Sequence, residues 1–254
     1  MTNVIRKIKT VVGCGLLAML TACNGILDDI YDEPATPAAG DIYIDASDWT
    51  QWHYIDLHAL KEATDKGEKP EQVYTTYDIP LEKTDSYDED KTGIYTYWYD
   101  VFGEGISNNE FRESYPTIRQ PEPKRWDLAF HRNNVRTNGG AAIETSITDI
   151  SQVGSHSVFS TIDFVCDTWN QTDVWTVQDR MLQGIVGNQR IKINTELGKW
   201  LRLDIPPMPP AFTHNSNVFV VRLADGTYAA IRLKNYIGTT NRKCQLTIEY
   251  KYPI

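Results

Sequence analysis

Residues 219–228 carry the sequence Phe219-Val220-Val221-Arg222-Leu223-Ala224-Asp225-Gly226-Thr227-Tyr228. Two runs of β-branched and aromatic residues flank an Asp-Gly pair. This pair supplies the positive φ that a tight primed turn needs. The stretch therefore predicts a β-hairpin.

Similar short runs, rich in β-branched and aromatic residues and bounded by turn residues, recur along the chain. They predict strands at Asp41–Ser47, Thr50–Leu57, Gly93–Val101, Arg125–His131, Lys199–Asp204, Asn217–Leu223, Thr227–Lys234 and Cys244–Tyr250. Leu57–Lys66 and Asp173–Leu182 are each expected to hold a turn or two of helix. The polar segments Lys61–Pro70 and Lys83–Lys91 are expected to be solvated loops. The pattern favours an all-β, antiparallel fold.

Length and charge limit the class of protein. The 254 residues suit one all-β or α/β domain or two small domains, and 41% hydrophobic residues provide for a sizeable core. The chain has 25 basic and 34 acidic side chains, a net charge of −9. Binding to phosphate backbones needs a basic surface, so nucleic acid is not an expected partner. No apolar run reaches the roughly 18 residues that a membrane-spanning helix needs.

The N-terminus has the pattern of a processing signal. Basic Arg6, Lys7 and Lys9 precede a short apolar run, Val11 to Leu20. The following Leu20-Thr21-Ala22-Cys23 resembles a bacterial lipobox, which implies removal of residues 1–22 and lipidation of Cys23. Several acyl chains, at roughly 0.8 kcal/mol per CH₂, would hold the protein on a membrane surface. The alternative is an ordinary secretory signal with an incidental cysteine.

Residues 23–40 are expected to be a flexible tether. Removal of residues 1–22 takes three basic and no acidic side chains, so 22 basic and 34 acidic ones remain, a net charge of −12. The tether is acidic and contains Pro34 and Pro37, as extended linkers often do. An acidic stretch after the lipidated cysteine resembles the surface-export signal of Bacteroidetes lipoproteins. This resemblance implies an outer-membrane protein at the cell surface, with a shed soluble form as a further option.

Four cysteines are present, and two of them belong to the N-terminal region, Cys14 and Cys23. Cys166 and Cys244 remain. They could form a disulfide in an oxidising compartment or be two free thiols, and the sequence leaves both alternatives open.

The methionines outside the signal are Met181 and Met208. A methionine usually fills a gap in a core. Met208, however, lies in Pro206-Pro207-Met208-Pro209-Pro210, and prolines lack the N–H that a central strand needs. Met181 precedes Gly184 and Gly187 and is also expected in a loop. Thioether sulfur is a soft ligand that suits Cu(I) or haem iron, and two sulfurs match the two axial positions of a haem.

Several blocks of the chain resemble the HmuY family of haem-binding lipoproteins. These blocks are Ile44-Asp45-Ala46-Ser47, Trp52-His53-Tyr54, Trp126-Asp127-Leu128-Ala129-Phe130-His131-Arg132, Val135-Arg136, Asn138, Trp200-Leu201, Val218 to Tyr228, and Thr247-Ile248-Glu249-Tyr250-Lys251-Tyr252-Pro253. The resemblance covers most of residues 41–254 and is thin across 58–124, where the chain carries a long insertion.

The resemblance implies a single all-β domain over residues 41–254 in which two loop regions clamp a haem. The best-known member of the family uses two histidines as ligands, but this chain offers none at the expected places. Other members use a methionine pair, so the resemblance implies that Met181 and Met208 are the axial ligands. His214 is the main rival ligand. His131 is expected to be structural, and His53, His58 and His156 have no metal-ligand spacing.

The resemblance also implies partners and a role in haem acquisition. The expected partners are haem, a TonB-dependent outer-membrane receptor that takes over the haem, and host haemoproteins as donors. We find no Gly-x-Ser-x-Gly motif and no credible catalytic triad, so enzyme activity is not expected. Gly103-Glu104-Gly105 is too short for a dinucleotide loop, and Asp85 to Asp90 is expected to be a solvated acidic loop rather than a Ca²⁺ site.

Two other functions remain open. The first is a surface lipoprotein that binds glycans, for which Tyr95, Tyr97 and Tyr99 could form a platform on one face of a strand, although cross-strand packing is the more common role. The second is a structural or adhesive surface protein. Titration with haem separates the haem-binding function from both.

Overall fold

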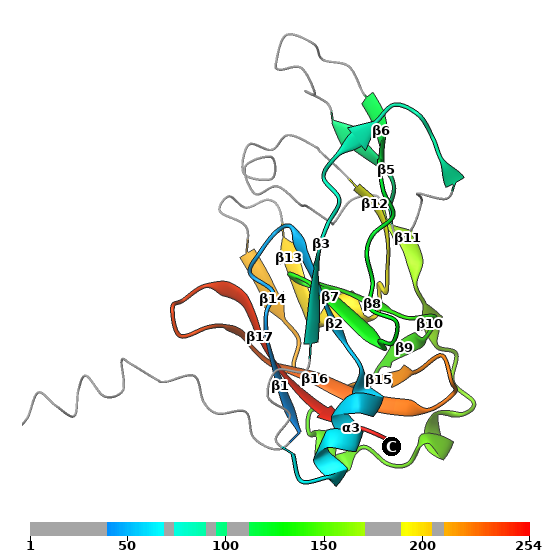
Figure 1. Ribbon diagram of the computed structural model, residues 1–254. Helices are drawn as coiled ribbons and strands as arrows, with labels where there is room; N and C mark the ends of the chain where they lie inside the picture. Colours follow the sequence, from blue (N-terminus) through cyan, green and yellow to red (C-terminus); the bar gives the residue numbers. More distant parts are fainter. Residues whose placement is uncertain (1–39, 69–73, 90–94, 101–111, 171–188, 205–210) are drawn as a thin grey trace, which may run out of the picture. The chain divides into compact units, whose positions relative to one another are not determined.

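A computed structural model describes residues 40–68, 74–89, 95–100, 112–170, 189–204 and 211–254 (Figure 1). All the elements described below belong to one unit, residues 37–238 and 242–254. A second unit, residues 1–36 and 239–241, contributes only residues 239–241 to the described part. The N-terminal signal and nearly all of the tether predicted above therefore lie outside the described residues.

The described residues form one α-helix and many short strands, which confirms the predicted all-β fold. The helix is α3 (Leu57–Asp65), and the 3-10 turns are η2 (Ile150–Gln152), η3 (His156–Phe159) and η4 (Leu197–Trp200). The strands are β1 (Asp41–Asp45), β2 (Gln51–Ile55), β3 (Tyr74–Asp78), β4 (Lys83–Thr84), β5 (Tyr95–Asp100), β6 (Arg112–Pro116), β7 (Leu128–His131), β8 (Asn134–Thr137), β9 (Ala141–Glu144), β10 (Val165–Cys166), β11 (Thr168–Asn170), β12 (Gln189–Ile193), β13 (Leu201–Asp204), β14 (Ala211–His214), β15 (Phe219–Arg222), β16 (Tyr228–Ile237) and β17 (Lys243–Lys251).

The strands form four antiparallel sheets in the described part of the chain. Their strand orders are β1-β17-β16-β15-β9-β10, β11-β12-β5-β6-β4, β3-β2-β7-β8 and β13-β14. All eight strands predicted from the sequence are present. The sequence missed β3, β4, β6, β8 to β12 and β14, most of which are short or carry few β-branched residues. The two residues of β4 also correct the expectation that Lys83–Lys91 is entirely loop.

The predicted hairpin is β15–β16, with Arg222 paired to Tyr228. Its turn differs from the predicted one. The amide of Leu223 donates to the carbonyl of Thr227, which leaves three residues between them rather than two. Gly226 has φ +84, and Asp225 does not have a positive φ. The connection is therefore a three-residue loop closed by a left-handed glycine, not a two-residue primed turn.

The largest apolar cluster lies between the six-stranded sheet and the four-stranded sheet. It contains Phe219 and Val221 from β15, Leu246 and Ile248 from β17, and Phe130 from β7, all almost fully buried. Burial of each large apolar side chain stabilises the fold by about 1.5–3 kcal/mol. The other face of the four-stranded sheet is also buried, in a second cluster that includes Trp52, Tyr54 and Trp126. This sheet is therefore covered on both faces.

Helix α3 confirms the short helical segment predicted at Leu57–Lys66. It also corrects the expectation that Lys61–Pro70 is entirely loop, because the helix continues to Asp65. Asp56 caps its N-terminus by accepting a hydrogen bond from the amide of Ala59, at 2.9 Å. Leu57 and Leu60 attach the helix to the large apolar cluster. The other predicted helical segment, Asp173–Leu182, lies outside the described residues. Within the described ranges, no helix has the length and apolar character that would let it span a membrane.

Cys166 and Cys244 are both free thiols in the structure, so the disulfide alternative is not the one adopted. Cys166 is exposed at the end of β10, whereas Cys244 is buried in β17. Burial raises the pKa of Cys244 to about 11. This thiol therefore stays protonated at neutral pH.

Candidate functional site

Both predicted haem ligands, Met181 and Met208, lie outside the described residues. The structure does describe the strands on either side of each. Met181 belongs to the segment between β11 and β12, and Met208 to the segment between β13 and β14. In each case the flanking strands pair with one another in antiparallel fashion. Each methionine therefore belongs to a connection whose two ends are held together by the described strands.

The end of β13–β14 nearest Met208 is fixed by the last ladder pair, Asp204 with Ala211. The Asp204 carboxylate accepts hydrogen bonds from Arg202 Nε, at 2.7 Å, and from Thr213 Oγ1, at 2.8 Å. These two hydrogen bonds, with the charge of Arg202, hold the pKa of Asp204 below its ordinary value. The carboxylate is therefore ionised at neutral pH, and each of its two oxygens accepts a hydrogen bond at the base of this connection.

The other end of β13–β14 is anchored in the core by Trp200. The indole is fully buried, stacks on Phe130 with 5.4 Å between ring centroids, and donates from Nε1 to the carbonyl of Asn133 at 3.1 Å. After β14, the amide of Asn215 donates to the carbonyl of Trp200 at 2.9 Å. The hairpin that leads to Met208 thus begins and ends on a rigid support.

The strands that flank Met181 are anchored by a buried polar network. Asn194, directly after β12, donates from Nδ2 to the carbonyl of Val165 and to Asp167 Oδ1, at 2.9 and 3.0 Å. The amide and the hydroxyl of Thr137 also donate to the Asp167 carboxylate, at 2.8 and 2.9 Å. Burial raises the pKa of Asp167, although these hydrogen bonds act in the opposite direction. The network ties β10 and β11 to the end of β12 and to β8.

All five histidines of the chain lie in the described part, and each has at least one ring nitrogen engaged. The rival ligand His214 ends β14 and donates from Nε2 to the carbonyl of Leu233 at 2.8 Å. His131 is fully buried and donates from Nε2 to the carbonyl of Trp49 at 2.8 Å. The structural role expected for His131 is therefore confirmed.

Burial also sets the charge of two core histidines. It lowers the pKa of His131 to about 4 and that of His53, whose Nδ1 lies 3.0 Å from Thr76 Oγ1, to about 4. Both rings are neutral at pH 7. They lie on opposite faces of the sheet, because His53 is opposite Phe130 in the β2–β7 ladder while His131 packs on Trp52.

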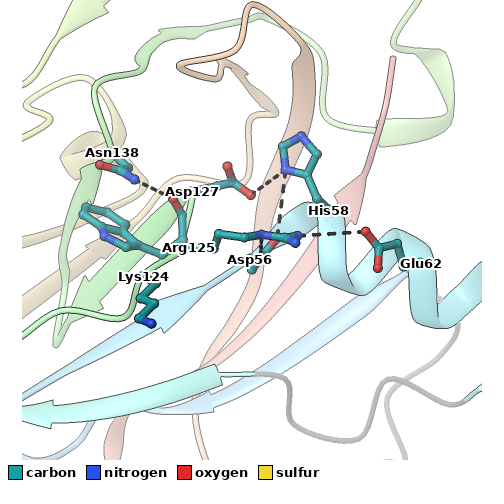
Figure 2. Close-up of a pocket in the computed structure, with 8 residues that line it drawn as sticks. Asp56, His58, Glu62, Lys124, Arg125, Asp127 and Asn138 are labelled. Atoms are coloured by element: carbon teal, nitrogen blue, oxygen red, sulfur yellow. Dashed lines mark hydrogen bonds and ion pairs between the residues drawn. The ribbon is translucent and has the colours of Figure 1, made fainter.

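A pocket of about 390 Å³ lies beside α3, away from the two methionine-bearing segments in the sequence (Figure 2). Its lining residues are Asp56, His58, Glu62, Lys124, Arg125, Trp126, Asp127 and Asn138. His58, one of these lining residues, contacts Asp127 and Asp225. This cluster is not predictable from the sequence, because Asp127 and Asp225 are 69 and 167 positions from His58 and no spacing pattern connects them.

The fold and the two anchored connections define an all-β protein of the kind predicted from the sequence blocks. The profile of a family described as HmuY protein matches residues 48–250. The chain therefore belongs to the HmuY family. The match includes the whole segment 58–124, in which the resemblance of individual motifs is thin.

Three solved structures illustrate the relationship. A proposed HmuY-like haem-binding protein from Bacteroides vulgatus has 28% identity and a TM-score of 0.56, covering 88% of this chain and 99% of its own. A proposed lipoprotein from Bacteroides fragilis has 26% identity and a TM-score of 0.56, covering 87% and 94%. The apo HmuY analogue of Tannerella forsythia has 20% identity and a TM-score of 0.59, covering 88% of this chain and 100% of its own. This likeness shows the shared fold. No match was found among curated proteins.

Proposed function

We propose that this chain is a lipid-anchored surface protein that binds haem as its cargo and passes it on for uptake. The observation that carries the proposal is its membership of the HmuY family over residues 48–250. The B. vulgatus neighbour, itself proposed to bind haem, supports it at 28% identity over nearly its whole length.

We infer that Met181 and Met208 are the axial ligands of the bound haem. Two observations support this assignment. Each methionine belongs to a connection whose ends are anchored by paired strands, as a clamp requires. His214, the rival donor six positions after Met208, already donates from Nε2 to the carbonyl of Leu233. Thioether sulfur is a ligand that haem iron accepts.

The ligand chemistry sets the expected properties of the complex. Most of the affinity comes from burial of the apolar macrocycle, at roughly 25 cal/mol per Å². Thioethers favour ferrous over ferric iron. A thioether has no proton to gain, so ligation persists at acid pH, where a histidine pair would be protonated. Oxidation of either methionine to its sulfoxide weakens binding.

We propose that the protein is anchored in the outer membrane through Cys23 after removal of residues 1–22, with residues 23–40 as its tether. The likeness to the proposed lipoprotein of B. fragilis, at 26% identity, supports this placement. A TonB-dependent receptor is the proposed acceptor of the haem, host haemoproteins are the proposed donors, and a shed soluble form is part of the same hypothesis.

Haem titration of the purified chain tests the proposal. We expect saturable absorption changes that differ with and without dithionite. Loss of one axial ligand in Met181→Ala or Met208→Ala should weaken binding by more than about tenfold, since loss of outer-shell support alone commonly costs 10–100-fold. Val158→Ala, at an exposed position on η3, is the matched control and should bind as the unmodified chain does.

The outcomes separate the function from the ligand assignment. If the unmodified chain gives no saturable haem spectrum, the proposed function is wrong. If haem binds but the double variant Met181→Ala/Met208→Ala leaves affinity and spectra unchanged, only the ligand assignment is wrong. His214→Ala then identifies the rival, since its loss would change the spectrum.

A further inference from the structure

The ring of His58 lies between two carboxylates that come from distant parts of the chain. Nδ1 is 3.3 Å from Asp127 Oδ2, and Nε2 is 2.8 Å from Asp225 Oδ2. A neutral imidazole has one N–H, so it can donate to only one of these carboxylates. The other ring nitrogen would then direct a lone pair at an oxygen anion. The geometry favours a ring that carries both protons.

The surroundings of the ring reinforce this charge. The titratable and charged groups around it are Asp56 and Glu62 at α3, Lys124, Arg125 and Asp127 before β7, Asp225 in the β15–β16 turn, and Tyr252 after β17. Asp56 Oδ1 is a third carboxylate oxygen, 3.9 Å from Nδ1. Arg125 is directed at Asp56 and Glu62, at 2.9 and 4.0 Å, as Figure 2 shows. The carboxylates thus outnumber the cations around the ring.

The balance between burial and the nearby carboxylates decides in which direction the pKa of His58 shifts. Burial by itself lowers the pKa of His58, but the hydrogen bonds to Asp225 and Asp127 and the charges of both carboxylates outweigh it. The pKa of His58 therefore lies above its ordinary value of 6.5. The two carboxylates that contact His58 differ in their own pKa shifts. Burial raises the pKa of Asp127, whereas hydrogen bonds from Thr227 and His58 lower the pKa of Asp225.

We propose that protonated His58 is a pH-dependent latch that ties α3 at once to the start of β7 and to the β15–β16 turn. The turn is also linked to the C-terminal segment, because Thr227 Oγ1 lies 3.2 Å from the hydroxyl of Tyr252, whose ring packs edge-on against His58. When His58 loses a proton, one N–H remains for two carboxylates, and one of the two links is lost.

The sign of the pH dependence follows from the direction of the shift. A histidine whose folded-state pKa is raised contributes stability that is complete below about 6.5, its unfolded value. This contribution is lost as the pH rises through the folded-state pKa. The latch is therefore closed under acidic conditions and opens on the alkaline side.

A bound cation is the competing explanation, since Asp56, His58 and Asp127 offer three ligand atoms within 4.8 Å of one another. The existing contacts argue for the proton. Asp127 Oδ2 already accepts from the amide of Leu57 at 2.7 Å, and Asp56 accepts from Ala59 and from Arg125. A metal would also need the neutral form of the ring. Zinc binding is therefore an outcome that the test must detect.

NMR titration of the histidine rings in the full chain tests the latch. We expect His58 to titrate above pH 6.5 and to shift toward 6.5 in Asp225→Asn, in which the amide oxygen can still accept from Thr227 while the charge is gone. His156→Gln, at an exposed histidine that contacts the carbonyl of Ile254, is the matched control and should leave the His58 titration unchanged. A His58 that titrates at or below 6.5, or identically in Asp225→Asn, would overturn the proposal.

Amide exchange and zinc addition complete the test. Exchange at Gly226 and Thr227, corrected for the intrinsic rate, should accelerate as the pH rises through the His58 titration. In Asp225→Asn this pH step should disappear. If zinc chloride at equimolar concentration shifts the His58 signals and a chelator reverses the shift, the site holds a cation and the latch is overturned. Signals that zinc leaves unchanged support the proton.

Discussion

Two antiparallel hairpins of this chain, β13–β14 and β15–β16, have ladders of the same length, four residue pairs each, but very different connections. In β15–β16 three residues join Leu223 to Thr227, and Gly226 adopts the left-handed φ that closes the loop. In β13–β14 six residues, five of which are Pro206, Pro207, Met208, Pro209 and Pro210, join Asp204 to Ala211.

The difference separates residues used for folding from residues available for binding. In β15–β16 the residues of the turn serve the turn itself, because Asp225 Oδ1 accepts from the amide and hydroxyl of Thr227. In β13–β14 the last ladder pair is Asp204 with Ala211, and Met208 belongs to the segment that joins them. A methionine has no backbone property that a hairpin turn requires. The proposed ligand role of Met208 therefore does not conflict with the hairpin.

Acidification is expected to give the largest effect, because it weakens the core but not the base of β13–β14. His53 and His131 have folded-state pKa values of about 4, against an unfolded value near 6.5. The unfolded chain therefore binds more protons between these values, and stability falls as the pH drops from about 6.5 to about 4. Each ring contributes roughly 3 kcal/mol to this loss.

Urea unfolding at several pH values measures that loss. The lowered pKa of Asp204 preserves the base of β13–β14 until the pH falls below 3.8. Amide protection at Thr213, which pairs with Arg202 in the ladder, should therefore fall no more between pH 6.5 and pH 4 than the global free energy of unfolding does. An unfolding free energy that stays constant from pH 6.5 to 4 would contradict the neutral state of the two core histidines.

Trp200→Ala removes the core anchor of β13–β14. Its buried indole stacks on Phe130 and satisfies the carbonyl of Asn133. We expect a loss of about 3–5 kcal/mol in the free energy of unfolding, measured by chemical denaturation. Val158→Ala, at a position with 64% exposure, should change it by less than about 0.5 kcal/mol. A loss for Trp200→Ala no greater than that of the control would show that the hairpin is supported elsewhere.

Gly226→Ala tests the turn of β15–β16. An added Cβ would meet no atom within 4 Å, so the cost comes from the backbone alone at φ +84. We expect a loss of about 1–2 kcal/mol. Gly198→Ala is the matched control, since its Cβ also meets nothing and its φ is not positive. Equal effects of the two substitutions would mean that the left-handed conformation is not what closes this loop.

Asp204→Asn is expected to have the smallest effect on stability. Asp204 contacts Arg202 and Thr213 at an exposed site, and exposed ion pairs contribute little. The unfolding free energy should change less than in Gly226→Ala. Leu203→Ala, at the preceding position in the same strand, provides a comparison for the hairpin itself. A larger loss for Asp204→Asn than for Gly226→Ala would show that the base carboxylate holds the connection.

Local sequence was a good guide where local physics decides the structure. The β-branched and aromatic run Phe219–Val221 and the Asp-Gly pair predicted the β15–β16 hairpin, although not its exact loop length. The eight predicted strands are rich in β-branched and aromatic residues. Strand β6, with Arg112, Glu113 and Ser114, has no such pattern, and it is a strand because β5 pairs with it. Pairing between distant segments cannot be inferred from composition.

The candidate site divides in the same way. The pair Met181 and Met208 was singled out from the sequence, because the methionines are few and one of them is surrounded by prolines. The protonation states of the histidines, in contrast, could not be predicted from the sequence. His131 and His58 are the same residue type, yet burial holds the pKa of His131 at about 4, while the carboxylates of Asp225 and Asp127 raise that of His58.

The sequence by itself determined the all-β character, the main hairpin and the family, because these depend on neighbouring residues or on ordered motifs. It also singled out Met181 and Met208, whose role as haem ligands is a proposal. Only the tertiary structure decided that Cys166 and Cys244 stay apart and that His58 meets Asp127 and Asp225. Such contacts join residues many strands apart. Their energies depend on distance and burial in the folded chain, which no short stretch of sequence encodes.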